Sequence, residues 1–565
     1  MKRSFTALLL AATLLPTGVV LAAEQEHTSA TVKQVAGVPE VAPIPPMIQK
    51  TMDRLFTLQP AFKQLRIETS TPDKITNTFS ISLTDASIGS SGHLTFDMET
   101  GELRSFDIQM KEWVSKKKPS TTLAKEKAEQ FLISWLGAEG RKQFGEPTSN
   151  GSGSSTIYDS DQNPTTWAER QVEFPFLLNN IPVSSREFFR MEVDGVGHIV
   201  SFRYNPPNLK NVAIPTATHI RSAEDMKKQL ITEDSLALQY VEKQPEKSYS
   251  SLKEEQETKL ALRYDLLNYG FFDAQTGKSI STMTGEEIKQ DSFFSAPWKV
   301  VQIHPQGNKL VAHSEKEAAE VVSKAFNFDF SQIQLQKHDD PPFSRDGQGD
   351  PYLNYSWTNA KDISIHANGE KASGWITSAS LDISGENSHP ATVSKEEAFA
   401  TALAFIEKYT GPTAKELDVQ YATFGLEQPP AWVDKGKLPK FVGNEQENHH
   451  FWFFERYEGI PVMERLHMVT VDSATGKIIS FSLAPYKETL SLPVPKGVIS
   501  KEKAAESFLQ NKKLKLEYVW PSYFDQLAPA PILTYTWEPS ENIDDYVDAF
   551  TSNYVQVPIE RDDEE

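Results

Sequence analysis

The chain has 565 residues, a formal net charge of -20 and no cysteine, and 39% of its residues are hydrophobic and 10% aromatic. The length indicates roughly three or four domain-sized units, and the apolar content excludes wholesale disorder. The absence of cysteine excludes a disulfide framework and any thiolate metal site. An acidic balance without a long Lys/Arg block excludes a surface for nucleic acid or anionic lipid.

The N-terminal segment has the pattern of a cleavable signal peptide, 1–23. The basic start Met1–Arg3 precedes an apolar run, Phe5–Leu21, and the small pair Ala22–Ala23, which are the parts of an export signal. A membrane anchor is the alternative, but Thr, Pro and Gly interrupt the run before it reaches the ~20 apolar residues of a spanning helix. No later segment is long and apolar enough to span a bilayer. We therefore expect a secreted, extracellular protein, free or associated with the cell wall.

In the rest of the chain, several sequence segments recur at a long, nearly constant spacing. Asn180–Val183 recurs as Gly459–Val462, 279 residues later, and the hairpin pattern of Asp194–Phe202 recurs as Asp472–Phe481. Further landmarks keep a spacing of about 273–279 residues. Because several landmarks share one spacing, two homologous halves are the simplest explanation.

This repeat and the composition define the expected organisation. The segments are a signal peptide (1–23), a Pro-rich leader (24–43), a first half (44–285), a connector (286–313), a second half (314–553) and an acidic tail (554–565). Helix patterns alternate with strands closed by hairpin turns in each half. This alternation predicts an α+β fold of tandem units, about three in each half, with one helix packed on an antiparallel sheet.

Serine residues mark the starts of several expected helices. Ser314, Ser394 and Ser500 each precede a segment with apolar helical periodicity, and the first two have glutamate three residues on. This is the capping-box pattern. We expect a helix to begin after each serine, with one apolar face towards a sheet.

The hairpin turns share the pattern Asp-x-x-Thr-Gly. Asp97–Gly101, Asp273–Gly277 and Asp472–Gly476 have this pattern, and Ser552 stands at the glycine position of a further copy. An Asp side chain can accept hydrogen bonds from backbone amides two residues on, and glycine supplies a positive φ. Metal binding or acid catalysis is the alternative role for these aspartates, but the turn geometry accounts for them fully.

These residues together resemble a known family. The Ile-Pro-Val strand at 460–462, the hairpin Val471–Phe481, the helix start Ser394–Ala398 and the turn Asp273–Gly277 resemble the secreted YcdB/YcdC repeat family of Gram-positive bacteria, which is related in pattern to PepSY domains. The resemblance covers nearly the whole mature chain. It implies tandem PepSY-like units and a non-catalytic extracellular module, with peptidase inhibition or protein binding as its role.

The sequence carries no signature of a catalytic or metal centre. Gly151–Ser155 has the wrong register for a hydrolase Gly-x-Ser-x-Gly elbow, and there is no His-Glu-x-x-His. Adjacent side chains on a strand point to opposite faces, so we interpret His449–His450 as a surface doublet. The loop Asp339–Asp350 does not have the EF-hand spacing, which favours a solvated loop and leaves calcium binding open. We assign no catalytic residue, cofactor or metal ligand.

One aromatic run is the best candidate for a binding surface. Phe-Trp-Phe-Phe at 451–454 is typical of a core strand, but it becomes a protein-binding patch if two of its members are exposed. The candidate surface residues are Trp452, Phe454 and Arg456. Arg456 is also expected to form a surface ion pair with Glu458 or Glu464.

Two classes of function remain open. The first is a secreted, non-catalytic binding or regulatory protein, with an extracellular or cell-envelope protein as partner and peptidases among the candidates. It is favoured because the repeat leaves no room for a separate enzyme domain. The alternative is a secreted hydrolase with a carboxylate site between the two halves, which a buried pair of carboxylates with raised pKa would support. A structural component of the cell surface is a third option, but no anchoring motif indicates it.

Overall fold

The structure is a computed structural model of the chain. It describes residues 42–74, 76–85, 89–149, 151–158, 164–184, 188–210, 212–242, 260–288, 299–328, 330, 336–337, 352–358, 363–383, 391–424, 428–439, 448–484, 492–538 and 543–558. The predicted signal peptide, nearly all of the leader and the loop Asp339–Asp350 lie outside the described residues.

The described part is α+β, as predicted, with six α-helices and mainly antiparallel sheets. The helices are α2 (Pro46–Leu58), α3 (Thr121–Arg141), α4 (Ala223–Leu230), α5 (Glu315–Phe326), α6 (Lys395–Tyr409) and α7 (Lys501–Asn511). The predicted caps are confirmed at Ser314, Ser394 and Ser500, whose hydroxyls accept the backbone N–H three residues on. Ser120 and Ser222 cap α3 and α4 in the same way.

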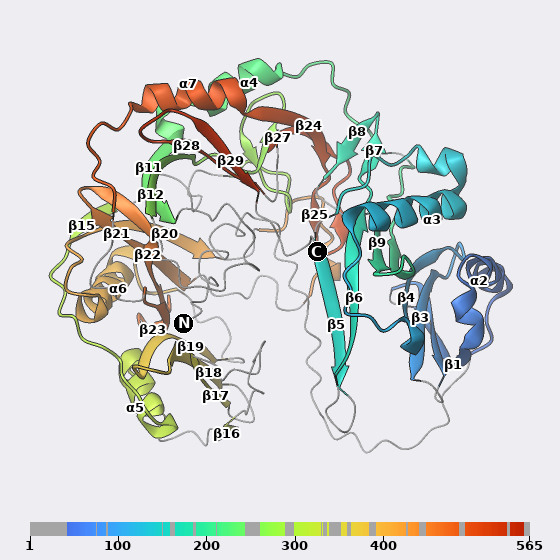
Figure 1. Ribbon diagram of the computed structural model, residues 1–565, viewed down its shortest axis with the longest axis horizontal. Coiled ribbons are helices and arrows are strands. Elements are labelled where there is room, and N and C mark those ends of the chain that lie inside the picture. The colour runs from blue at the N-terminus through green and yellow to red at the C-terminus, as the bar shows by residue number, and fades with distance from the viewer. Residues whose placement is uncertain are drawn as a thin grey trace.

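The first large sheet has eight strands and is antiparallel throughout. In spatial order they are β1 (Arg66–Asp73), β2 (Thr78–Asp85), β3 (Ser90–Asp97), β4 (Leu103–Gln109), β10 (Ile199–Tyr204), β9 (Phe189–Asp194), β6 (Pro164–Glu173) and β5 (Ser152–Tyr158). Alternate residues such as Phe79, Phe106 and Phe202 are buried in a core shared with α2 and α3. The two helices lie on the outer face of this sheet (Figure 1), and none of the described helices covers the other face.

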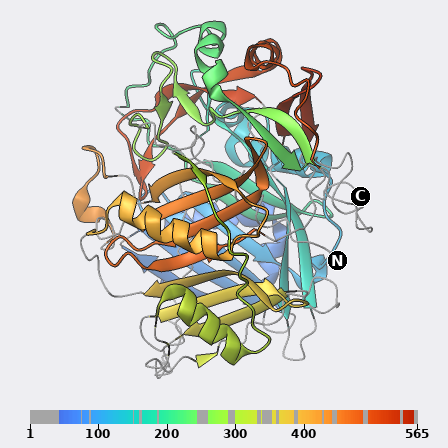
Figure 2. The same ribbon diagram turned by 90° about the vertical axis from the view of Figure 1, so that its left-hand side faces the viewer.

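The second large sheet has a corresponding strand order. Its strands are β16 (Gln336–Lys337), β17 (Tyr352–Thr358), β18 (Ile363–Glu370), β19 (Trp375–Ile383), β23 (Ile478–Ser482), β22 (Ile460–Val471), β21 (Asn448–Tyr457), β20 (Glu416–Phe424) and β15 (Lys299–Gln302). From β16 to β20, the strands of this sheet correspond one by one, in the same spatial order, to the strands of the first sheet from β1 to β5. Figure 2 shows α5 and α6 in front of this sheet, where they cover its outer face. Each of the two sheets therefore has two helices, so the expected separate helix-over-sheet units are merged.

The remaining strands are shared between the two predicted halves. A six-stranded sheet has the order β14 (Ser279–Ile280), β13 (Phe271–Asp273), β27 (Ile532–Glu538), β24 (Lys513–Val519), β8 (Ile181–Val183) and β7 (Phe176–Leu178). The second large sheet continues from β22 into β11 (Leu236–Glu242), β12 (Leu260–Leu266), β28 (Ile543–Asp548) and β29 (Tyr554–Pro558). The hairpin β13–β14 thus pairs with strands of the second half, and the hairpin β28–β29 pairs with strands of the first.

This reciprocal pairing defines two exchanged units. The neutral unit is the six-stranded sheet with α4, which packs on β24. The ionic unit is the four strands β11, β12, β28 and β29 with α7, which packs on β28 and β29. Each unit joins the Ile-Pro-Val strand of one half through one parallel pair, Tyr518 with Val183 and Tyr240 with Val462. Figure 1 shows the exchanged units bridging the two large sheets.

Two expected boundaries differ from the structure. The predicted connector, 286–313, contains β15, which pairs with β20, and it also contributes Ile303, Leu310 and Ala312 to the core of the second sheet. The predicted acidic tail, 554–565, begins with β29, which pairs with β28. Both segments therefore begin or contain a strand that belongs to a sheet. Small elements complete the fold: β25 (Ser522–Tyr523), β26 (Gln526–Leu527) and 3₁₀ helices at Pro60–Gln64, Lys111–Trp113, Glu233–Ser235 and Lys435–Lys437.

Candidate functional site

The two aromatic residues of the expected binding surface are buried. Trp452 is 5% exposed and Phe454 is 3% exposed, and both pack with Ala422 in a small cluster on the face of β21 opposite α6. Their neighbours Phe451 and Phe453 face the helix side in the main core. A binding role requires at least two of these four aromatic side chains to be exposed, but all four are buried.

Arg456, the third residue of that surface, pairs with acids on the neighbouring strand. The expected pairing with Glu458 or Glu464 is wrong, because the guanidinium contacts Glu416 through Nε at 3.1 Å and Asp418 through Nη1 at 2.7 Å. A β-bulge at residue 455 shifts the register of β21 against β22. A bulge re-aims the side chains that follow it, which brings Arg456 against β20. Burial raises the pKa of Asp418, and Arg456 opposes this shift.

The histidine doublet is not an exposed surface pair, because His449 is buried and His450 is half-buried. His449 is 7% exposed and bonds through Nδ1 to the Tyr421 hydroxyl at 2.9 Å and through Nε2 to the Val393 carbonyl at 3.0 Å. His450 bonds to Thr470, and burial together with His449 lowers its pKa to about 4. Across the described residues there is no group of three side chains that could hold a metal ion.

The turn aspartates have the conformational role that the sequence predicts. Asp97 Oδ1 accepts hydrogen bonds from Glu99 N at 3.0 Å, Thr100 N at 2.8 Å and Thr100 Oγ1 at 3.0 Å. The same three bonds occur in the other copies, where the aspartates are Asp273, Asp472 and Asp548. Oδ1 of each aspartate is therefore held by hydrogen bonds within its own turn.

A carboxylate pair does lie between the two predicted halves, but both carboxylates contact one arginine. Arg263 on β12 contacts Asp265 through Nε at 2.9 Å and holds both oxygens of Asp544 on β28, at 2.6 and 3.2 Å. Burial raises the pKa of Asp265, while Arg263 lowers it. The arrangement is an ion cluster inside a sheet, and neither aspartate lines either of the two depressions described next.

Both depressions lie on the helix-free face of the first sheet, where polar side chains form cross-strand rows. One row, called here the arginine row, is Ser80, Thr95, Ser105, Arg203, Arg190 and Glu173. The next row, called the carboxylate row, is Ser82, His93, Asp107, Ser201, Glu192 and Gln171. Side chains on one face repeat every second residue, so adjacent rows are about 7 Å apart.

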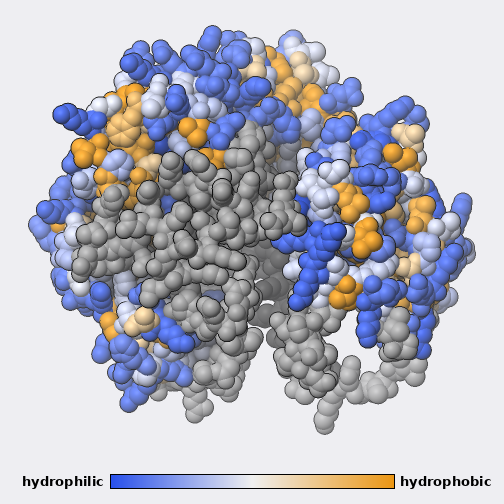
Figure 3. Space-filling view, viewed as in Figure 1, coloured by the Kyte–Doolittle hydropathy of each residue, from blue (hydrophilic) through white to orange (hydrophobic). Residues whose placement is uncertain are grey.

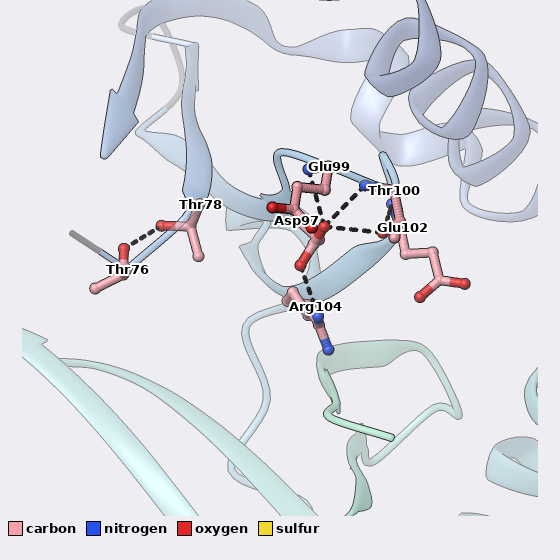
Figure 4. A network of polar contacts seen from close by, with 7 residues as sticks. All are labelled: Thr76, Thr78, Asp97, Glu99, Thr100, Glu102 and Arg104. Atoms are coloured by element: carbon pink, nitrogen blue, oxygen red, sulfur yellow. Dashed lines mark hydrogen bonds and ion pairs between the residues drawn. The ribbon is translucent and has the colours of Figure 1, made fainter. Parts of the chain in front are cut away.

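The first depression has a volume of about 360 Å³ and lies over β2, β3, β4 and β10. A β-bulge between β3 and β4 pairs Ser105 with Thr95 and Leu103 with Phe96, which leaves Arg104 as the extra residue. Arg104 and Ser105 therefore both line the depression. Arg104 Nη2 contacts Asp97 Oδ2 at 2.7 Å, and Figure 4 shows it approaching the aspartate from the side opposite the turn amides.

The second depression, of about 350 Å³, lies by the carboxylate row and includes His93 and Asp107. Glu169 on β6 lies next to this row. Burial raises the pKa of Glu169 to about 7, and the negative charges of Glu192 and Asp107 add to the shift. The helix-free face thus has a cationic row beside an acidic region, a charge pattern that no sequence motif indicated.

The corresponding face of the second sheet has a different chemistry. The positions equivalent to Arg190 and Glu173 are Met468 and Trp452, which belong to or pack against the buried aromatic cluster. Equal topology therefore does not give the two faces equal accessibility. On the face of the first sheet, accessible charges lie beside both of the depressions described above.

Residues 303–484 match the family model of the YcdB, YcdC repeated domain. This segment is similar to a YcdB/YcdC repeat. The match confirms the resemblance over about a third of the chain, from the end of β15 through β23. No curated protein matches the chain.

Two solved structures are similar to the chain at a low level. The Bacillus megaterium YpeB C-terminal domain matches with 16% identity and a TM-score of 0.24, over 43% of this chain and 97% of that chain. A structure from a study of two prolyl endopeptidases matches with 10% identity and a TM-score of 0.10, over 83% of this chain and 45% of that one. Scores of this size support no inference about function. No helix in the described ranges combines the length and the apolar character needed to cross a membrane.

Proposed function

We propose that this protein is a secreted, non-catalytic binding or regulatory protein whose partner contacts the helix-free face of the first sheet. The partner is an extracellular or cell-envelope protein, with peptidases among the candidates. The observation that carries the proposal is the accessible arginine row and its depression on that face. A YcdB/YcdC repeat within the chain supports the binding class.

The polar character of the surface supports recognition by charge and hydrogen bonds. Figure 3 shows a mostly hydrophilic described surface on which hydrophobic residues are dispersed. Partners that bind mainly by apolar burial use contiguous exposed apolar patches, whereas complementary charges give specificity and fast association. The aromatic cluster that the sequence favoured as a binding surface is buried, so the charged face of the first sheet is the better candidate for binding a partner.

Two groups of carboxylates favour binding over hydrolysis at their own positions, whereas Glu169 and Glu464, whose pKa burial raises to about 7, are the acids on which the alternative, a hydrolase, would depend. The cross-half pair, Asp265 and Asp544, is held by Arg263, and a guanidinium in this position leaves neither acid free to activate water. The turn aspartates are committed to backbone amides. We also propose that the chain arose by duplication, which the corresponding strand orders of the two large sheets support.

The test places a bulky residue on the proposed face. Ser105→Trp should reduce capture of the partner from culture supernatant and envelope extract at least severalfold, because it fills the depression. The matched control is Ser378→Trp, which changes the corresponding residue of the second sheet and should leave capture unchanged. Equal capture by both variants would reject this face. Turnover of a peptide or glycan by the wild type, abolished by Asp544→Asn, would reject the binding class.

A further inference from the structure

We propose that the depression over β2, β3, β4 and β10 binds a carboxylate group of an acidic peptide segment. The inference rests on the proposed function, since it names the chemistry by which the partner would be held. The argument starts from the arginine row, which places three guanidinium groups on or beside the depression: Arg104 on β4, Arg203 on β10 and Arg190 on β9.

Arg203 is the cation available to a ligand. It is exposed and lines the depression, and within the described part of the chain its guanidinium has no ion pair. Arg104 already contacts Asp97 at 2.7 Å, and Arg190 lies 3.9 Å from Glu192. The row therefore has one uncompensated positive charge, which matches a carboxylate better than a doubly charged phosphate. The planar fork of arginine also fits both oxygens of a carboxylate.

The placement of Arg203 opposite another arginine is electrostatically unfavourable, and a bound anion would reduce this repulsion. Arg203 and Arg190 stand directly opposite each other on antiparallel strands, and like charges in that relation destabilise a sheet. The equivalents of Arg104 and Arg203 in the second sheet are Thr377 and Ser482. The fold is therefore built there without either cation, so the arginines are not required by the topology.

The rest of the depression suits a peptide. Thr95, Ser105 and Asn205 line it, and their side chains make no hydrogen bond within the described residues. These hydroxyl and amide groups can bond to a ligand carboxylate or to peptide backbone. The carboxylate row begins about 7 Å away, so an acidic side chain is attracted to Arg203 but repelled beyond it by Asp107. A ligand carboxylate is therefore expected to contact the arginine row and not the carboxylate row.

The test uses the mature full-length protein and a fluorescein-labelled hexaglutamate peptide at low ionic strength, with binding followed by anisotropy. The net charge of -20 opposes nonspecific binding of this peptide, so association reports a local site. Arg203→Gln should weaken binding roughly tenfold or more, because a charge-assisted bond is lost. The matched control, Arg66→Gln, removes an exposed arginine from edge strand β1 of the same sheet and should change binding less than twofold.

Competition defines the ligand chemistry. Acetate should displace the peptide at least as well as inorganic phosphate at equal ionic strength, and stronger displacement by phosphate would overturn the carboxylate assignment. No binding by the wild type, or unchanged binding by Arg203→Gln with an unchanged urea midpoint, would overturn the site. If Ser105→Trp abolishes partner capture while Arg203→Gln leaves both capture and peptide binding intact, only this inference fails. Peptide binding that depends on Arg203 without any partner capture would count against the proposed function alone.

Discussion

The two exchanged units have corresponding topologies but different interiors. In the ionic unit, β12 carries Arg263 and Asp265, and Asp544 on β28 completes the cluster. The strand registers place Thr534 and Thr536 of β27 at the two corresponding positions of the neutral unit. Their hydroxyls donate to the carbonyls of Glu517 and Gly270, so each threonine satisfies its polar group without any charge.

The neutral unit is neutral only at these threonine positions, because Glu517 on its strand β24 is buried and pairs with Lys515 at 3.1 Å. The comparison shows that the pairing of strands from the two predicted halves does not depend on an ion cluster at the positions of Arg263 and Asp265. Both units bury an equivalent tyrosine, Tyr264 and Tyr535, whose hydroxyl donates to a backbone carbonyl. Buried apolar surface is the common driving force. A buried ion pair gains little net stability over well-packed neutral residues, although removing one partner is costly. The charges of the ionic unit therefore favour this particular pairing of β12 with β28 more than they stabilise the fold.

The largest expected effect comes from removing the central cation. Arg263→Leu leaves two buried carboxylates without their counter-ion and should lower the free energy of unfolding by about 3–5 kcal/mol, measured by urea denaturation. Thr534→Val, at the corresponding position of the neutral unit, should cost about 1 kcal/mol. The triple variant Arg263→Thr, Asp265→Thr, Asp544→Asn should recover most of the loss. A loss below about 1 kcal/mol for Arg263→Leu would contradict this account of the ionic unit.

A second, smaller effect concerns Glu464, whose carboxylate accepts the backbone N–H of Glu242 at the end of β11 in the ionic unit. Burial raises the pKa of Glu464 from 4.5 to about 7. Between these pH values the folded state keeps a proton that the unfolded state has released, so stability falls as the pH rises through this window.

Glu464→Gln removes this titration while keeping an acceptor for the amide. At pH 8 the variant should be more stable than the wild type by about 3 kcal/mol, and below pH 4.5 the difference should disappear. Urea denaturation at the two pH values measures it. Glu396→Gln, an exposed change on α6, is the control and should show no such dependence. An advantage of Glu464→Gln that is equal at both pH values would rule out titration as its cause.

The smallest effect compares the hairpin turns of the two units. Ser552 has φ +59° where the neutral unit has Gly277 at φ +76°. A side chain in this left-handed region costs about 1 kcal/mol, so Ser552→Gly should raise the thermal midpoint slightly. Gly277→Ala should cost more than that gain, because its Cβ would lie 2.4 Å from the Gln229 side chain. Destabilisation by Ser552→Gly would show that the extra backbone freedom of glycine in the unfolded state outweighs the relief of strain.

Much of the local structure could be predicted from the sequence. The α+β class, the caps at Ser314, Ser394 and Ser500 and the bonds of the turn aspartates follow from residues within four positions of one another. The resemblance to YcdB/YcdC repeats rested on the same short motifs, and the family match confirms it for 303–484. Local hydrogen bonds need no knowledge of the rest of the chain, which is why these predictions were possible.

The candidate site could not be predicted in this way. Period-two alternation shows that Trp452 and Phe454 share a face of β21 and that Arg104 and Arg203 lie on strands, but it does not show which face is covered. The bulge that turns Arg104 outward depends on the register of β3 against β4. The cation row also requires β10 to lie beside β4, although nearly a hundred residues separate them.

The sequence by itself therefore determined the repeated motifs, the helix starts and the turns, because these depend on short-range backbone hydrogen bonding. Only the tertiary structure decided the exchange of hairpins between the predicted halves, the pairing of Asp265 and Asp544 with Arg263, and the burial of Trp452. These features join residues up to about 280 positions apart. Their free energy comes from area buried between distant strands, and two strands with the same alternating pattern can satisfy that requirement with different partners.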